Sequence, residues 1–176
     1  MTAGAFSLAE QLPALQVTVP LAAAAVCALI DQRHVAWVIA TLTSFAMPVI
    51  AVLLLMQVLT GGPVSYAFGG WAPPWGIEYR VDVVNGALLV LISVVGAIIM
   101  PYARLSVAAE IADNKQAWFY TMYLLCLAGL LGMTITHDAF HAFVFMEVSS
   151  QPMYVLVTLG RHRPPRPPPH PRALPG

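Results

Sequence analysis

Charged side chains are scarce in this chain: Asp, Glu, Lys and Arg make up only 9% of its 176 residues. A soluble domain usually carries about 25% charged residues, so the scarcity excludes an ordinary soluble domain. Basic and acidic residues balance at eight each, and this balance gives no sign of nucleic-acid binding. In place of charge the chain has 59% hydrophobic residues and a mean hydropathy of +0.77, which predict an all-α integral membrane protein.

Cysteine and clustered metal ligands are also rare. Cys27 and Cys126 each lie inside an apolar run, so we expect small core residues rather than a disulfide or a metal pair. His137 and His141 are one helical turn apart, but no second cluster supplies further ligands, and we predict neither a metal site nor a cofactor. The first 16 residues contain no Lys or Arg, so we expect no cleavable signal peptide.

Long apolar runs make up most of the chain. A helix needs about 20 mostly apolar residues to cross the hydrocarbon core of a bilayer. Five stretches meet this requirement, and we predict five transmembrane helices at Leu12–Ile30, Val35–Leu59, Val83–Ala103, Trp118–Thr136 and Ala139–Leu159.

The basic residues of the loops predict an orientation in the membrane. Lys and Arg gather on the cytoplasmic side of membrane proteins. Arg33, Arg104 and Lys115 fall on one side of the five spans, and Arg80 falls on the other. We therefore predict an outer N-terminus and an inner C-terminus.

The connection between the second and third predicted helices differs from the others. Alternating side chains at Val64–Phe68 and Ile77–Val81 flank the turn-like segment GGWAPPWG. The pattern predicts a short β-hairpin on the outer surface. The alternative is an irregular interfacial loop anchored by Trp71 and Trp75.

Glu147 is the one acidic residue inside a predicted span, and it lies roughly 12 Å into the fifth helix at 1.5 Å per residue. A charge near a helix centre costs about 2.5–3.5 kcal/mol, so such residues face a protein interior and usually serve a function. Ser150, Gln151 and Tyr154 follow at helical spacing and extend a polar stripe from Glu147. Pro152 removes a backbone hydrogen bond and loosens the helix just past the carboxylate. The pattern predicts that Glu147 relays protons.

A second interpretation makes Glu147 a neutral acid that joins neighbouring helices through a hydrogen bond. His141 lies about 120° around the helix from Glu147, so it falls off the polar stripe. It remains a candidate for proton entry because histidine titrates near neutral pH.

Three segments resemble the proton-conducting membrane transporter family. DAFHAFVFMEVSSQPMYVLVTLG (138–160) resembles the family's fifth-helix pattern Asp-x-Phe-Asn-x-Phe-Val-Phe-x-Glu-x-Ser-Ser. LLCLAGLLGMTIT (124–136) resembles its fourth helix, and GGWAPPWGIEYRVD (69–82) the loop entering its third. The family includes the D subunits of Mrp-type Na+/H+ antiporters, antiporter-like subunits of complex I and subunits of membrane-bound hydrogenases. The branch of the Mrp-type D subunits is the favoured match, over about Leu12 to Gly160.

The resemblance implies that Glu147 matches the family's essential helix-five glutamate, which pairs with a lysine on a later, broken helix and modulates proton movement. The sequence departs from the pattern at His141, where the family usually has Asn, and at Gln151-Pro152, which replace small or apolar residues. Family members have about fourteen helices built around two inverted repeats. We therefore expect a subunit truncated after the fifth helix, without the lysine partner.

Residues 161–176 differ sharply from the five-helix part at 1–160. They hold seven of the 15 prolines and four of the eight basic residues, so we expect disorder. One explanation is a natural Pro/Arg-rich tail that binds anionic lipid or a partner. The preferred explanation is a frame change in a GC-rich gene.

These observations predict a transporter subunit rather than an enzyme, in the cell inner membrane. It would belong to a multisubunit monovalent cation/proton antiporter and act on protons and on Na+ or another monovalent cation. Its partners would be the lipid bilayer and other integral membrane subunits. One alternative is a proton-pumping subunit of a complex I-like NADH:quinone oxidoreductase or a membrane-bound hydrogenase, with the redox centres on other chains. The other is a structural or assembly protein that transports nothing.

Overall fold

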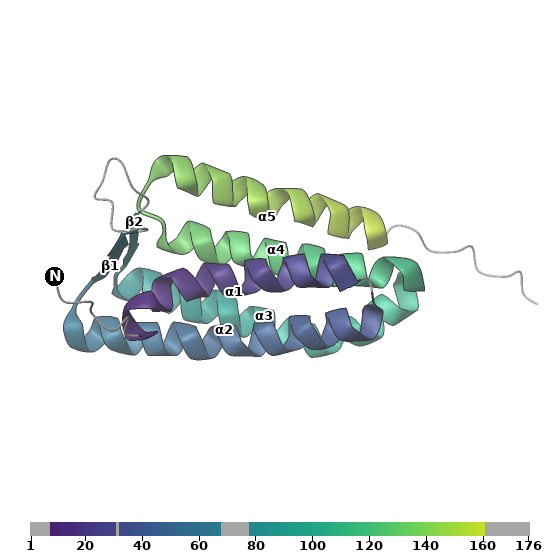
Figure 1. Cartoon of the computed structure of the whole chain (residues 1–176), viewed down its shortest axis with the longest axis horizontal. Coiled ribbons are helices and arrows are strands. Elements are labelled where there is room, and N and C mark those ends of the chain that lie inside the picture. The colour runs from purple at the N-terminus through teal and green to yellow at the C-terminus, as the bar shows by residue number, and fades with distance from the viewer. Residues whose placement is uncertain (1–7, 31, 68–77, 161–176) are drawn as a thin grey trace, which may run out of the picture.

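The computed structural model describes residues 8–30, 32–67 and 78–160 of the chain. Five long helices run side by side (Figure 1): α1 (Leu8–Ile30), α2 (Arg33–Gly61), α3 (Val83–Glu110), α4 (Gln116–Ile135) and α5 (Ala139–Gly160). Each is long and apolar enough to cross a membrane, which confirms the five predicted spans within the described part of the chain. The orientation in the bilayer stays a prediction.

The predicted helix limits differ from the structure mainly in α3. This helix continues past the predicted end at Ala103 to Glu110. The extra turns contain Ala, Leu and other helix formers, which continue a helix even where polar residues make the segment too hydrophilic for a membrane core. A short 3-10 helix, η2 (Asp113–Lys115), then leads into α4.

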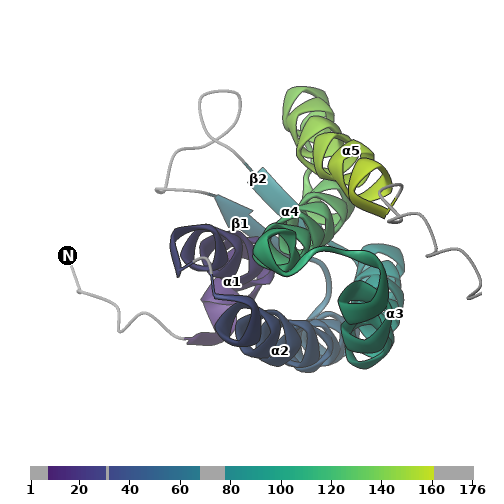
Figure 2. The same ribbon diagram turned by 90° about the vertical axis from the view of Figure 1, so that its right-hand side faces the viewer.

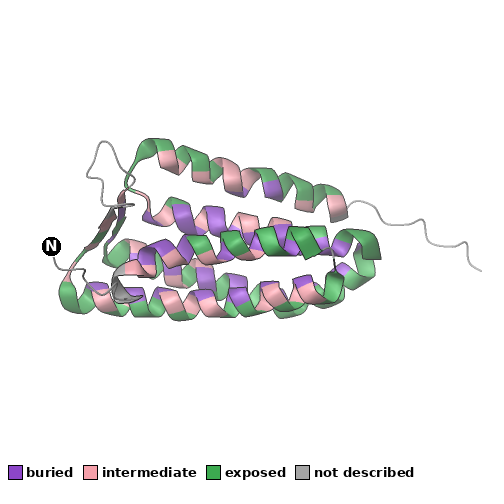
Figure 3. Cartoon of the chain, in the orientation of Figure 1, coloured by how far each residue is buried: buried purple, intermediate pink, exposed green. Residues whose placement is uncertain are grey.

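Helices α1 to α4 form a bundle, and α5 lies on its outside (Figure 2). Each helix of the bundle contacts the next around the ring, whereas α5 packs chiefly on α4. Burial follows this arrangement (Figure 3): half of the apolar window of α4 is buried, compared with 6% of that of α5. Most of the surface of α5 is therefore uncovered in this chain.

Two apolar clusters fill the bundle, one toward each end. The cluster nearer the β-strands includes Met47, Leu54, Leu89 and Leu131. The other is built around small residues and aromatic groups of all four helices, with Cys27 fully buried in it. Cys27 and Cys126 are both free thiols, and Cys126 is only half-buried.

The predicted β-hairpin is present as β1 (Val64–Ala67) and β2 (Glu78–Val81). The strands are antiparallel, with Val64 opposite Val81 and Tyr66 opposite Tyr79. The turn at 68–77 lies outside the described residues, and so does the predicted tail at 161–176. An isolated bridge joins Tyr79 to Thr136, so the hairpin is tied to the connection between α4 and α5.

Candidate functional site

The position of α5 depends on two glycines of α4. A Cβ atom at Gly129 would lie 2.7 Å from the backbone nitrogen of Ser149, and one at Gly132 would lie 2.5 Å from the ring of Phe145. Real Cβ atoms essentially never approach so closely. Small residues of this kind let two membrane helices approach at backbone distance, where van der Waals contact holds them together. The two glycines thereby fix the position of α5, and with it the position of Glu147.

The start of α5 is held by Asp138. Its carboxylate accepts a hydrogen bond from the backbone N–H of Phe140 at 3.2 Å and lies 2.5 Å from Nδ1 of His141. The hydrogen bond to His141, followed by the backbone bond, lowers the pKa of Asp138 below its ordinary value. His137 donates its backbone N–H to the Glu78 carbonyl at 3.3 Å, which links this turn to the hairpin.

Glu147 lies near the middle of α5 and is half-buried. It borders a groove of about 560 Å³ between α1, α4 and α5. Apart from Gln151, the groove is lined by apolar residues: Leu21, Met122, Leu125, Val148, Pro152 and Val155. The Gln151 side-chain amide donates a hydrogen bond to Oε2 of Glu147 at 3.3 Å. The carboxyl group is thus placed against apolar surface with one polar neighbour.

The other residues of the predicted stripe are arranged less tightly. Ser150 is half-buried, and its hydroxyl lies 3.4 Å from the Glu147 backbone carbonyl rather than near the carboxylate. Tyr154 is 69% exposed, and no hydrogen bond of its hydroxyl occurs among the described residues. The structure therefore brings Glu147 and Gln151 together and leaves Tyr154 on the open surface of α5.

His141 pairs with Asp138 and not with Glu147. A role for His141 in proton entry stays a prediction. Within the part of the chain that is described, His, Cys, Asp and Glu side chains form no group of three that could hold a metal ion.

Sequence reasoning missed a polar pair inside the bundle. Nε2 of Gln16 on α1 donates to Oγ of Ser93 on α3 at 3.2 Å, and both side chains are fully buried. Ser93 in turn donates to the Leu89 carbonyl at 2.6 Å. Gln16 is the one amide in the first predicted span, and an amide in an apolar helix commonly bonds across to a neighbour.

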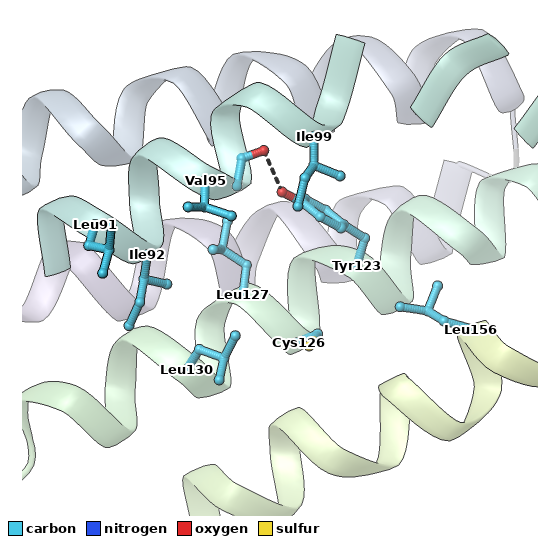
Figure 4. A pocket seen from close by; sticks show the side chains of 10 residues that line it. Leu91, Ile92, Val95, Ile99, Tyr123, Cys126, Leu127, Leu130 and Leu156 are labelled. Atoms are coloured by element: carbon cyan, nitrogen blue, oxygen red, sulfur yellow. Dashed lines mark hydrogen bonds between the residues drawn. The ribbon is translucent and has the colours of Figure 1, made fainter. Parts of the chain in front are cut away.

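A second contact between helices involves a tyrosine. Tyr123 on α4 donates its hydroxyl to the Gly96 carbonyl of α3 at 2.7 Å (Figure 4). The pair borders an apolar groove of about 370 Å³ between α3, α4 and Leu156 of α5. The bond satisfies a hydroxyl that would otherwise be stranded among apolar side chains.

Comparisons with known proteins place this arrangement among membrane complexes, although no protein-family model matches the sequence. The N subunit of NADH-quinone oxidoreductase from Desulforudis audaxviator is 35% identical over 159 residues, which covers 89% of this chain and 32% of that protein. The D subunit of an Na+/H+ antiporter from Alkalihalophilus pseudofirmus is 28% identical over 147 residues, covering 83% and 29% respectively. A chain of the Mrp complex from a Dietzia species superposes with a TM-score of 0.75 at 26% identity, over 86% of this chain and 27% of that one.

This chain is a homologue of the Mrp antiporter's D-type subunits and of the N-type subunits of complex I. This chain spans about a third of the length of the curated relatives it matches. Like those subunits it is a multi-pass membrane protein, since its five long helices are apolar enough to cross a bilayer. In this antiporter-subunit homologue the uncovered side of α5 and the groove beside Glu147 form the candidate functional site.

Proposed function

We propose that the chain is a subunit of a multisubunit monovalent cation/proton antiporter, in which Glu147 takes up and releases a proton within the membrane. The observation that carries the proposal is the position of Glu147, half-buried near the middle of an apolar helix and beside an otherwise nearly apolar groove. Such a carboxyl group is costly to keep in a membrane-spanning segment, and proteins retain such groups on ion and proton paths. The similarity to an Na+/H+ antiporter subunit supplies the reaction class.

The surface of α5 supports a place among other membrane subunits. This helix contacts chiefly α4, and large apolar residues cover much of its remaining face, among them Phe140, Phe143, Met146 and Met153. Lipid accounts for part of this surface. Neighbouring helices that bring a positive charge close to Glu147 would complete the path. A nearby positive charge favours the ionised carboxylate, and withdrawal of that charge favours the protonated form.

A second candidate function rests on the relative with 35% identity, which is a subunit of NADH-quinone oxidoreductase. In that role the chain would move protons in a complex whose redox groups lie on other chains. The chemistry of Glu147 is the same in both, so the two functions differ in the driving reaction. Copurification tests this directly: tagged chain should bring down either antiporter subunits or redox subunits of its own host.

The transport proposal is tested in everted membrane vesicles from host cells that produce the chain with its copurifying partners. A pH-sensitive dye reports proton release on addition of Na+, K+ or Li+. Glu147→Gln keeps the shape of the side chain and its bond to Gln151 but removes the titratable proton, and should reduce cation-dependent proton movement to background. Thr158→Val is the matched control, because among the described residues its hydroxyl bonds only to the Val155 carbonyl of its own helix.

The measurement has two informative outcomes. Loss of activity in Glu147→Gln together with retention in Thr158→Val supports the relay. Undiminished activity in Glu147→Gln, at equal amounts of assembled complex, contradicts it and leaves the structural interpretation in which the glutamate joins helices.

A further inference from the structure

A cavity of about 210 Å³ is lined by residues of α2, α3 and α4. In Figure 1 the start of α2 lies at the end of the bundle opposite the β-strands. The cavity is formed where the first turns of α2 and α4 meet the C-terminal part of α3. Exposed Arg33 and Arg104 carry positive charge at its wall. Buried Gln116 and Tyr120 also line it, at 6% and 2% exposure. The grooves beside α5 contain no such basic side chains.

Two helices begin beside this cavity without a side-chain cap. Gln32 precedes α2 without a side-chain cap, and the first turn of α2 contains no acidic residue. Lys115 precedes α4, also without a side-chain cap. The first N–H groups of a helix lack partners within the helix and carry partial positive charge, which suits an anion. The indole N–H of Trp37, another lining residue, is buried and has no acceptor among the described residues.

The two arginines of the cavity wall differ in their partners among the described residues. Arg33 forms an ion pair with Asp113 and donates from Nε to Nε2 of His34 at 3.3 Å. Arg104 forms no ion pair within the described part of the chain, and its guanidinium instead lies 4.3 Å from the centre of the Trp37 ring. Among the described residues that line the cavity or pair with its lining, one carboxylate, Asp113, therefore stands against two guanidinium groups.

We propose that this cavity binds the phosphate group of an anionic phospholipid. Guanidinium groups and helix N-termini are donors that recognise phosphate oxygens. Basic pockets between membrane helices bind lipid headgroups of this kind. The cavity lies at the ends of apolar spans, beside tryptophan and tyrosine, which is the depth of the headgroups. Leu105 and Val38, at 76% and 44% exposure, offer nearby apolar surface for the acyl chains. The proposal does not rest on the transport activity.

The test is lipid binding to the purified full chain, measured by native mass spectrometry from detergent. Phosphatidylglycerol and phosphatidylcholine are titrated separately, since both carry a phosphate but only the first has net negative charge. Arg104→Gln should weaken phosphatidylglycerol binding about tenfold, because a charge-assisted hydrogen bond contributes about 1.5–3 kcal/mol. Arg104→Lys should restore part of the loss, and Arg80→Gln, which removes an arginine from the opposite end of the bundle, should have no effect.

Each result decides the proposal. Selective retention of phosphatidylglycerol that depends on Arg104 supports it, provided that Arg104→Gln melts at the same temperature as the unaltered chain without lipid. Equal binding of the two lipids, or equal loss with Arg80→Gln, overturns it. Inorganic phosphate is the remaining arm: if it displaces phosphatidylglycerol at matched concentration, the cavity is a site for free phosphate and the lipid assignment is wrong.

Discussion

The side-chain amide of Gln151 donates a hydrogen bond to the carboxylate of Glu147 across one turn of α5, with 3.3 Å between Nε2 and Oε2. Gln151 is the polar residue that touches this carboxylate directly within the described chain. Its carbonyl oxygen can accept a hydrogen bond from water, so the amide is suited to link Glu147 to a path along the open side of α5.

Gln151→Leu keeps most of the side-chain volume but removes this hydrogen bond. We expect slower cation-dependent proton movement, by about fivefold, because a long and partly exposed bond contributes about 1 kcal/mol. The same dye assay in everted vesicles measures the rate. Gln151→Asn, which has a shorter side chain, should show a rate between those of the unaltered chain and Gln151→Leu. An unchanged rate in Gln151→Leu would exclude the amide from the proposed path.

Gly129→Ala should destabilise the chain by about 1–3 kcal/mol, the usual cost of overpacking. The added methyl group would meet backbone atoms of Phe145 and Ser149 at 2.8 and 2.7 Å, and a backbone cannot swing aside as a side chain can. Unfolding in mixed micelles of mild detergent and SDS measures the change. Gly61→Ala is the matched control because nothing lies within 4 Å of its Cβ position, and equal stability of both variants would contradict the close approach of α4 and α5.

Ser93→Ala should cost about 1–3 kcal/mol, since it leaves the buried Gln16 amide without its partner. Combining it with Gln16→Leu should recover much of that loss, because apolar groups then replace both members of the pair. The same micelle titration completes the double-mutant cycle. Simple additivity of the two losses would mean that the hydrogen bond between α1 and α3 contributes nothing measurable.

The lowered pKa of Asp138 predicts a pH dependence of stability near the start of α5. A folded-state pKa below the ordinary 3.8 means that the ionised carboxylate stabilises the folded chain. This contribution is complete above pH 3.8 and is lost as the pH falls through the lowered value. Asp138→Asn can still cap the helix but carries no charge. It should melt lower than the unaltered chain at pH 7, and the difference should vanish at the lowest pH. A difference that persists there would assign the effect to shape instead of charge.

Much of the fold follows from local patterns. Five apolar runs predict five helices because a backbone in hydrocarbon must satisfy its hydrogen bonds within the segment. The hairpin follows from alternation at Val64–Phe68 and Ile77–Val81, and the structure pairs Val64–Ala67 with Glu78–Val81. The end of α3 was harder to place, because hydropathy marks the membrane core whereas helix propensity continues beyond it to Glu110.

The candidate site was only partly accessible to sequence reasoning. Glu147 stands out because a carboxylate is expensive in an apolar helix. Helical spacing predicts that Gln151 and Tyr154 share a face with Glu147. Gln151 donates to the carboxylate, whereas Tyr154 is 69% exposed. Spacing describes one helix and carries no information on which side its neighbours cover. His141 pairs with Asp138, which lies one turn before it.

The sequence by itself determined that the chain crosses a membrane and where its helices run. It also determined which acidic residue lies within a membrane-spanning helix. These are properties of single segments, governed by the cost of moving each side chain from water into hydrocarbon. Only the tertiary structure decided that α5 packs on the outside of the bundle, that Gly129 and Gly132 set its approach, and that Arg33 and Arg104 meet at one cavity. Those relationships depend on contacts between segments that are distant in the sequence. They are set by how the side chains of different helices pack together.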